Sequence, residues 1–273
     1  MHSADSIIAA VDIGNTRAKF GLFRRAQSGQ LTADNIEAVQ LGSVAALLAA
    51  THAWGDQHQL LQKQCPVMLA GSNPDLREAL CDNWPIPSAV PQVVRSYNQI
   101  ALPLDVTHPE STGIDRLLNA VAARQLCGPD TTVIMVDSGT ATTVDLLSSD
   151  GVFRGGSILP GLRLSARAMH DYTARLPLLD VDETLVTLPV VPGRNTREAM
   201  LSGLFLGQLG AVREIITRLE SIIQQRWPSS HPTTILVSGG GGRQLADHLP
   251  DARYIDSLAL HGLALHGLAL LHR

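Results

Sequence analysis

The chain has 273 residues, of which 45% are hydrophobic and 17% are charged, and its formal net charge is -4 at pH 7. This composition is typical of a globular protein with a substantial core and excludes an intrinsically disordered chain. The mild negative charge offers no electrostatic footprint for nucleic acid or an anionic membrane. We therefore expect neither as a partner and favour a small, soluble ligand.

Cysteine usage and the N-terminal sequence indicate the compartment. The three scattered cysteines, Cys65, Cys81 and Cys127, are too few for a disulfide framework or a Cys-x-x-Cys metal site. The N-terminus lacks a basic region, and Asp12 interrupts the apolar run that follows before it reaches signal-peptide length. No segment reaches the roughly 20 apolar residues of a membrane span. These features predict a cytoplasmic protein.

The first predicted elements form a hairpin. A hydrophobic run from Ile7 ends in Asp12-Ile13-Gly14-Asn15-Thr16, and a second hydrophobic run begins near Lys19. This pattern indicates a strand, a tight polar turn and a strand. Glycine permits tight turns and close ligand approach, and an aspartate at a strand end can hold a cation. A single hairpin of this kind is also typical of an ordinary structural turn.

The rest of the first half predicts a small α/β lobe. Four elements follow in the order helix, strand, helix and strand, expected over residues 43–64, 66–71, 75–84 and 89–94. After a proline-containing loop, apolar spacing predicts a helix from about Ile114 to Leu126, which Gly128-Pro129 would stop. We place the end of a first lobe there, at residues 1–128.

The second half repeats this plan. Val136-Asp137-Ser138-Gly139-Thr140 again joins two hydrophobic runs. Further elements are strands around Val133, Val144 and Val152, helices from about Gly161 and over 196–226, and a strand at 234–237. The stretch Leu176 to Asn195 is expected to be an extended loop. We expect a second lobe over 129–273, ending in a capping helix that carries His261 and His266. Two facing hairpins would clamp a polyphosphate and its metal in a cleft between the lobes.

Three further segments are candidates for chemistry. Gly113-Ile114-Asp115-Arg116 lies at a helix start, where Asp115 could accept a proton and Arg116 could bind a carboxylate, or where Asp115 could simply complement the helix dipole. Gly155-Gly156 to Pro160-Gly161 and the run Gly239 to Gly242 could admit a ligand to bare backbone, or form ordinary turns and linkers. The chain contains neither a P-loop nor a Gly-x-Gly-x-x-Gly fingerprint.

Taken in order, five motifs resemble those of the type III pantothenate kinases. They are Asp12-Ile13-Gly14-Asn15-Thr16-Arg17-Ala18-Lys19, Gly113-Ile114-Asp115-Arg116, Asp137-Ser138-Gly139-Thr140-Ala141-Thr142-Thr143, Gly155-Gly156-Ser157-Ile158-Leu159-Pro160-Gly161 and Asn195-Thr196-Arg197-Glu198-Ala199-Met200. The resemblance implies an α/β fold of two duplicated ribonuclease-H-like lobes of the acetate and sugar kinase/actin superfamily, with ATP bound between them. The first lobe would carry the phosphate hairpin and the pantothenate-binding helix start, and the second would carry the other hairpin and the glycine-rich nucleotide loop.

The resemblance also implies a reaction: transfer of a phosphoryl group from ATP to the primary hydroxyl of pantothenate, giving 4'-phosphopantothenate in the first step of coenzyme A biosynthesis. Asp115 would be the general base. Pantothenate would be bound by Gly113, Ile114, Asp115 and Arg116, with the guanidinium on its carboxylate, and by Thr196, reached across the interface of a homodimer.

The remaining implied roles concern ATP and cations. ATP would be bound by Thr140 and by the hairpin residues Asp12, Ile13, Gly14, Asn15, Thr16, Arg17, Ala18 and Lys19. Asp12 would approach Mg²⁺, and Lys19 would approach the phosphates. Asp137 would hold a monovalent cation, K⁺ or NH₄⁺. These roles agree with the physics of phosphoryl transfer, in which the protein mainly positions reactants and neutralises charge.

One position departs from the family pattern. Members of the family often place a tyrosine three residues before the proline of the loop preceding Gly-x-Asp-Arg, and here Val106 precedes Pro109 at that spacing. We therefore transfer no aromatic substrate contact to this chain.

Two other functions compete with this one. A nucleotide-binding transcription accessory protein of the same fold could lack kinase activity, although the retained Asp12, Asp115 and Asp137 argue against that. A kinase or phosphatase of the same superfamily could act on a sugar or polyphosphate, but the Gly-x-Asp-Arg helix start favours pantothenate.

Overall fold

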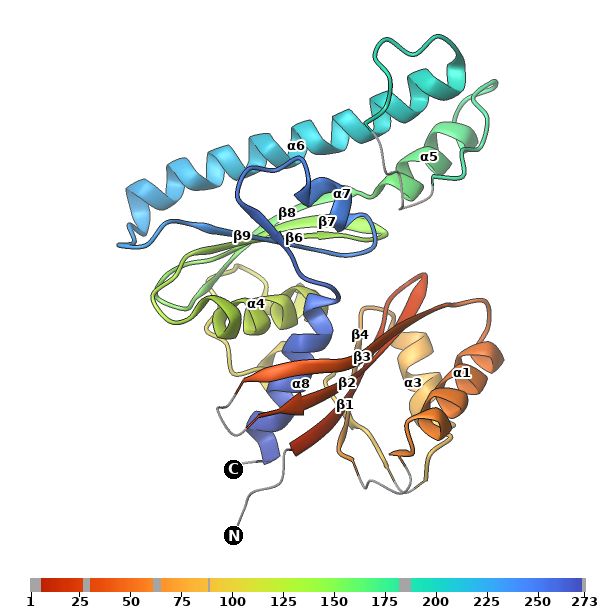
Figure 1. The fold of residues 1–273 in the computed structure, drawn as a ribbon, viewed down its shortest axis with the longest axis vertical. Coiled ribbons are helices and arrows are strands. Elements are labelled where there is room, and N and C mark those ends of the chain that lie inside the picture. Colours follow the sequence, from red (N-terminus) through yellow and green to blue (C-terminus); the bar gives the residue numbers. More distant parts are fainter. Residues whose placement is uncertain (1–5, 27–29, 61–64, 88, 182–187, 272–273) are drawn as a thin grey trace. The chain divides into compact units, whose positions relative to one another are not determined.

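The computed structural model describes residues 6–26, 30–60, 65–87, 89–181 and 188–271 (Figure 1). Internal contacts group the chain into two compact units. The first unit contains the chain up to Leu102, Thr107–Ala122 and the residues from Ser257 onward. The second contains Pro103–Val106 and Ala123–Asp256.

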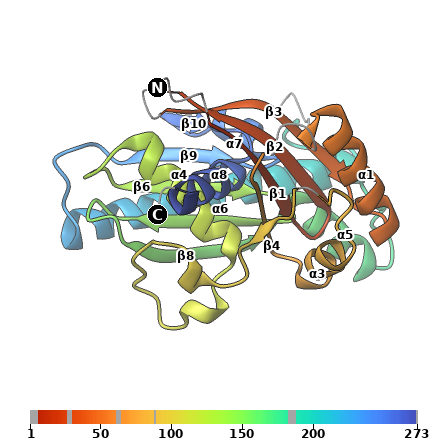
Figure 2. The same cartoon turned by 90° about the horizontal axis from the view of Figure 1, so that it is seen from below.

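The first unit is built on a five-stranded mixed sheet. Its order is β3 (Leu31–Gln40), β2 (Arg17–Arg25), β1 (Ser6–Ile13), β4 (Val67–Gly71) and β5 (Gln92–Val93). The first three strands are antiparallel neighbours, whereas β1, β4 and β5 run parallel. Helices α1 (Val44–Gln57) and α3 (Pro74–Asp82) lie on one side of this sheet and α8 (Leu258–Leu271) lies on the other (Figure 1 and Figure 2).

The second unit repeats this topology strand for strand. Its sheet has the order β8 (Phe153–Pro160), β7 (Ala141–Leu147), β6 (Val133–Ser138), β9 (Thr234–Ser238) and β10 (Ala252–Tyr254). Again the meander is antiparallel, and the last two strands add in parallel. Two sheets with the same order and the same strand directions confirm the predicted duplication.

Four more helices complete the described structure. In the second unit they are α5 (Leu162–Asp171), α6 (Thr196–Arg226) and α7 (Gly242–Ala246), and α4 (Ile114–Cys127) is divided between the units after Ala122. Short 3-10 turns occur at Tyr97–Gln99 and Pro109–Ser111. The 31-residue helix α6 runs along the second sheet (Figure 1), and its buried side chains, such as Phe205, Leu209 and Val212, join the core formed by the strands.

Strand alternation decides which residues face the helices. In the second sheet Ile134, Val136 and Val144 share a core with α6, so the even-numbered residues of β6 and β7 point toward that helix. In the first sheet Val11 and Phe20 share a core with residues of α1 and α3. Asp12 is adjacent to Val11 in β1, and Asp137 is adjacent to Val136 in β6. Because adjacent side chains of a strand point to opposite faces, each aspartate projects from the face of its own sheet opposite these helices.

Most predicted elements are present, with changes at their ends. The helix expected over 43–64 ends at Gln57, and residues 61–64 lie outside the described structure. The strand expected over 89–94 is reduced to Gln92–Val93. Within the predicted loop 176–195, the described residues form no helix or strand, and 182–187 lie outside the description.

The two units also differ from the predicted lobes, 1–128 and 129–273. The C-terminal helix α8 groups with the first unit, where Gly267 approaches Met68 and Ile8, and Gly262 lies against the Leu118 carbonyl group. This arrangement has a physical cause: the first sheet exposes a second apolar face, and a helix rich in leucine, alanine and glycine can cover it closely.

Helix α6 also bears on the expectation of no membrane span. It is long enough to cross a membrane, and an 18-residue window of it has a mean hydropathy of 1.3. Within the protein, 39% of that window is buried. Length and composition alone are therefore weak grounds for a membrane span in this helix.

Candidate functional site

The first hairpin presents Asp12 at the end of β1. Asp12 is 8% exposed and lies directly opposite Lys19 in the antiparallel register. The turn is closed by a hydrogen bond from the Gly14 amide to the Arg17 carbonyl oxygen, 2.9 Å, which leaves Asn15 and Thr16 exposed at its tip. The hairpin therefore combines a carboxylate, a facing ammonium group and exposed polar groups, a set suited to a metal-bound polyphosphate.

Backbone hydrogen bonds from two other segments hold the turn of the first hairpin. The Leu41 amide donates to the Thr16 carbonyl oxygen, and the Asn73 amide donates to that of Ile13. Asn73 also caps α3, because its side-chain oxygen accepts from the Leu76 amide at 3.2 Å. From within α3, the buried Arg77 guanidinium donates to the Gly71 carbonyl oxygen beside Ile13. Thus α3 fixes the end of the strand that carries Asp12.

The start of α4 presents Asp115 in the first turn, as predicted. The Asp115 carboxylate accepts a hydrogen bond from the Arg116 amide at 2.9 Å and lies over Gly113. A Cβ atom at position 113 would lie 2.5 Å from Asp115 Oδ1. A side chain at position 113 would therefore displace the Asp115 carboxylate, and Gly113 leaves the space that this carboxylate occupies.

The second hairpin presents Asp137 at the end of β6, beside the glycine-rich loop. The turn is closed by a hydrogen bond from the Gly139 amide to the Ala141 carbonyl oxygen, 3.0 Å, with Thr140 at its tip. Gly239 has φ +89°, and a Cβ atom there would lie 2.6 Å from Asp137 Oδ1. The left-handed backbone and this close approach both require glycine.

Further backbone groups converge on the same turn. The Gly161 amide, at the start of α5, donates to the Thr140 carbonyl oxygen, and the Gly241 amide donates to that of Ser138. The structure thus brings together three segments far apart in sequence: the second hairpin, the Gly161 turn and the loop 239–242. These segments contain the Asp137 carboxylate and the carbonyl oxygens of Ser138 and Thr140, and hard cations prefer oxygen donors.

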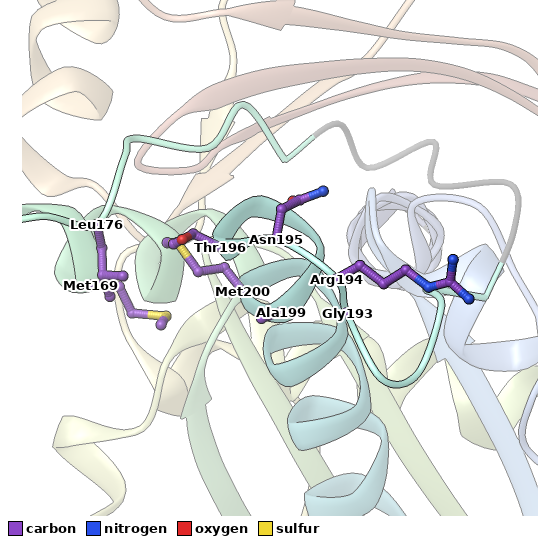
Figure 3. Close-up of a pocket in the computed structure, with 8 residues that line it drawn as sticks. All are labelled: Met169, Leu176, Gly193, Arg194, Asn195, Thr196, Ala199 and Met200. Carbon is purple, nitrogen blue, oxygen red and sulfur yellow. The ribbon is translucent and has the colours of Figure 1, made fainter.

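Thr196 lies in a separate place, on the first turn of α6. It lines an open pocket of about 470 Å³ together with Met169, Leu176, Asn195 and Met200 (Figure 3). Asn195 caps the helix by accepting from the Glu198 amide at 2.9 Å, and Glu198 in turn accepts from the Arg194 amide. Its lining combines apolar side chains with polar ones. Neither Asp137 nor Thr140 lines it.

Comparison of the sequence with known proteins places the chain in a family. A family model described as type III pantothenate kinase matches residues 8–218. The chain is 33% identical over 254 residues to a type III pantothenate kinase from Dehalococcoides mccartyi, covering 88% of each protein. It is likewise 33% identical over 261 residues to one from Chlorobaculum parvum, covering 92% of this chain and 90% of that protein. The chain belongs to the type III pantothenate kinase family.

A shorter match within the family is closer in sequence. The chain is 42% identical over 135 residues to the type III pantothenate kinase of Hyphomonas neptunium, which covers 50% of this chain and 48% of that protein. The similarity to the family is therefore strongest in part of the chain and extends, at lower identity, over most of it.

Solved structures confirm the fold class. A Campylobacter jejuni protein described as a Baf family transcriptional activator superimposes with a TM-score of 0.59 at 19% identity, covering 97% of this chain and all of that one. A Sinorhizobium meliloti protein described as a 2-dehydro-3-deoxygalactonokinase gives a TM-score of 0.52 at 15% identity, covering 96% of this chain and 99% of that one. At these identities the likeness shows the fold of the sugar kinases and actin-like ATPases, and nothing about function.

Some residues near the predicted site were missed from the sequence. Gln208 of α6 donates a hydrogen bond to Thr142 beside the second turn, and Asp145 is a buried acid that lies against Gly156. A signal for Gln208 was present, because it is a polar residue on an otherwise apolar helix stripe. Asp145 stands in a strand pattern that predicts burial, but nothing in that pattern explains why the buried residue is an acid.

Proposed function

We propose that this chain catalyses the ATP-dependent phosphorylation of pantothenate, with Asp115 as the general base. Family membership, shown by the match over residues 8–218 and by relatives aligned over most of their length, supports the reaction. The observation that supports the base is local. The Asp115 carboxylate is held at a helix start over a glycine that leaves space for it. A positioned carboxylate can accept the proton of an attacking hydroxyl.

The two hairpins would bind ATP and its cations. We assign Asp12 to Mg²⁺ and Lys19 to the phosphates, because one carboxylate together with substrate phosphates is a common way for proteins to hold Mg²⁺. We assign Asp137 to a monovalent cation, K⁺ or NH₄⁺, and Thr140 to an ATP contact. The Asp137 carboxylate and the bare backbone of Gly239 beside it fit a cation of this kind.

Pantothenate would be held by Gly113, Ile114 and Arg116 as well as by Thr196. Arg116 supplies a guanidinium group suited to a carboxylate. The pocket at Thr196 offers both apolar and polar walls (Figure 3), which fits an acceptor with methyl and hydroxyl groups.

A homodimer is also part of this proposal. Exposed hydrophobic residues gather on α5, on the loop that follows it and on the first half of α6: Leu164, Tyr172, Leu178, Leu188, Val190, Val191 and Leu206. Tyr172 is 89% exposed and Val191 is 66% exposed. Exposed apolar side chains of this kind fit an interface, and a second copy of the chain would cover them. Light scattering should give twice the chain mass of 29.2 kDa.

The cytoplasm is the proposed compartment, and cysteine chemistry supports it. The cysteines Cys65, Cys81 and Cys127 are free thiols. Burial raises the pKa of the Cys81 and Cys127 thiols and so keeps them protonated and poorly reactive. With a net charge of -4, the chain also offers no electrostatic basis for nucleic acid as a partner.

The test is ADP release by the purified protein with ATP, Mg²⁺ and K⁺, with and without pantothenate. We expect release that depends on pantothenate and is lost when Na⁺ replaces K⁺. Asp115→Asn should fold normally and lose at least about a hundredfold in turnover. Glu110→Gln, which removes an exposed acid from the preceding turn, is the matched control and should keep its activity. No release from a folded protein would favour the accessory-protein alternative, and near-normal turnover of Asp115→Asn would remove that residue from the role.

A further inference from the structure

Helix α6 carries one polar side chain among its buried residues. These residues are Met200, Phe205, Gln208, Leu209, Val212, Ile216 and Ile223, and they form the stripe that faces the second sheet. Gln208 is only 8% exposed. Burying a carboxamide costs free energy unless its polar atoms are paired, so an apolar residue would serve packing alone better.

The Gln208 amide is paired with the second hairpin. Its Nε2 donates to Thr142 Oγ1 at 2.6 Å and lies 3.5 Å from Ser138 Oγ, and the two hydroxyl groups lie 3.5 Å from each other. Ser138 and Thr142 are both buried and are direct partners across the β6–β7 register. Gln208 therefore joins the two strands at the point where the turn begins.

The oxygen atom of the Gln208 amide makes this arrangement unfavourable in free energy. Gln208 Oε1 is buried and has no hydrogen-bond partner among the described residues. An acceptor left unsatisfied in this way costs about 1–3 kcal/mol. The net contribution of Gln208 to stability is therefore small, which directs attention to the geometry that its amide imposes.

That geometry concerns the residue next to Ser138. Successive side chains of a strand point to opposite faces, so Ser138 and Thr142 face α6, whereas Asp137 and Thr143 face away from it. The direction of the Asp137 carboxylate depends on the backbone of Ser138. Gly241 also contacts Ser138: its amide donates to the Ser138 carbonyl oxygen at 3.0 Å, and a Cβ atom at position 241 would lie 2.8 Å from Ser138 Oγ. By holding Ser138 on the face toward α6, the Gln208 side chain thus also fixes the direction of Asp137 on the opposite face.

We propose that Gln208 is a positioning residue that sets the orientation of Asp137 and, through it, the affinity of the protein for a monovalent cation. This inference rests on the proposed role of Asp137 as the cation ligand. It makes Gln208 a determinant of cation affinity while placing it on the face of the sheet opposite the ligand.

The test uses Gln208→Met, which keeps the length of the side chain and removes its hydrogen bonds. Two quantities are measured for the full chain: the K⁺ concentration that gives half-maximal ADP release, and the rise in Tm that K⁺ causes in Na⁺ buffer at constant ionic strength without substrates. We expect the half-saturating K⁺ concentration to rise at least about fivefold, the scale of one lost hydrogen bond, with turnover at saturating K⁺ within about twofold. The K⁺-dependent rise in Tm should shrink, whereas the Tm without K⁺ should stay the same or increase.

Three further variants make the result specific. Thr142→Val removes the partner of Gln208 and should have the same effect, and the double variant should be no worse than either single one, because both changes remove one interaction. Gln224→Met changes an exposed glutamine on the same helix and should leave both readouts unchanged.

The outcomes separate this inference from the proposed function. If Asp137→Asn shifts the K⁺ response and Gln208→Met does not, the positioning role is wrong and the cation site stands. If the unmodified protein shows no K⁺ response in either readout, the cation role of Asp137 is wrong and the inference falls with it. If Gln208→Met lowers the Tm and the turnover by amounts that do not depend on the K⁺ concentration, Gln208 has a structural role only.

Discussion

The two Asp-x-Gly hairpins have the same place in two sheets of the same topology, but different residues surround their aspartates. In the first, Asp12 lies opposite Lys19, and in the second, Asp137 lies opposite Thr143. Two residues, Asn15 and Thr16, form the tip of the first turn, whereas Thr140 alone forms the tip of the second. The two copies thus share a backbone plan but differ in the side chains at matched positions, and we propose that they bind different cations.

The supports of the two hairpins differ as well. Charged groups of α3 support the first hairpin. Arg77 donates hydrogen bonds to the Gly71 carbonyl oxygen and to Glu78, and Glu78 also pairs with Arg95. A neutral carboxamide, Gln208, stands behind the second. The first support therefore responds to pH and the second does not.

The largest effect on activity is expected from substituting the residues that lie opposite the two aspartates. Lys19→Met removes the ammonium group proposed to neutralise phosphate charge, so pantothenate-dependent ADP release should fall about a hundredfold, about 2.7 kcal/mol. Thr143→Val removes a neutral hydroxyl and should cost less than about tenfold. Steady-state rates of the two purified variants check this contrast. Equal losses would mean that the two positions do not differ in function.

A smaller effect is expected on stability from glycines at the two sites. Gly239→Ala places a Cβ atom at φ +89° against the Ser138 carbonyl group and Asp137, and we expect a loss of about 2–4 kcal/mol in the free energy of unfolding. At Gly14, which lacks a left-handed φ, the nearest atom to an added Cβ would be the Arg17 carbonyl oxygen at 3.1 Å. Gly14→Ala should cost less than about 1 kcal/mol. Urea denaturation measures both, and a larger loss at Gly14 would contradict the packing described for the loop 239–242.

The smallest effect is expected from the ion pairs behind the first hairpin. The Arg95 hydrogen bond, aided by Arg77, lowers the pKa of Glu78 below its ordinary value of 4.5. The stabilisation is therefore fully present above pH 4.5 and is lost as the pH falls through the lowered value. Because Glu78 is partly exposed, Glu78→Gln should cost only about 0.5 kcal/mol at pH 7.

The pH dependence provides the control for this last prediction. Thermal unfolding at pH 7 and at pH 3 should show the difference between Glu78→Gln and the unmodified protein shrinking at the lower pH. Gln208→Met should show a difference that does not change with pH over the same range. A pH-independent effect of Glu78→Gln would mean that the ion pairs do not support α3.

The sequence predicted the fold well because the signals were local and repeated. Hydrophobic runs joined by Asp-x-Gly turns predict strands, and the predicted helix stop at Gly128 stands at the observed end of α4. The place of α8 was not predictable, since its nearly uniform apolar surface does not say which sheet it covers. The strand at 89–94 was overestimated because pairing with β4 extends over only Gln92 and Val93.

The candidate site was predictable only in part. Asp12 and Asp137 stand out because each stands at the end of a hydrophobic run, whereas Asp115 stands out only through the Gly-x-Asp-Arg motif of the family. The structure adds what no linear pattern contains: Gly239 against Asp137, Gly161 against Thr140, and Gln208 behind the second turn. These contacts join residues that are far apart in the chain and depend on the packing of α6 and of the glycine-rich loop on the sheet.

The most direct test of the division between the hairpins is a pair of titrations of pantothenate-dependent ADP release, with K⁺ at saturating MgATP and with Mg²⁺ at saturating K⁺. They are made on the unmodified protein, Asp12→Asn and Asp137→Asn. We expect Asp137→Asn to move the K⁺ curve and leave the half-saturating Mg²⁺ concentration unchanged, and Asp12→Asn to do the reverse. If both variants move both curves equally, the two hairpins do not bind separate cations, and the proposed division of ligands between Asp12 and Asp137 is wrong.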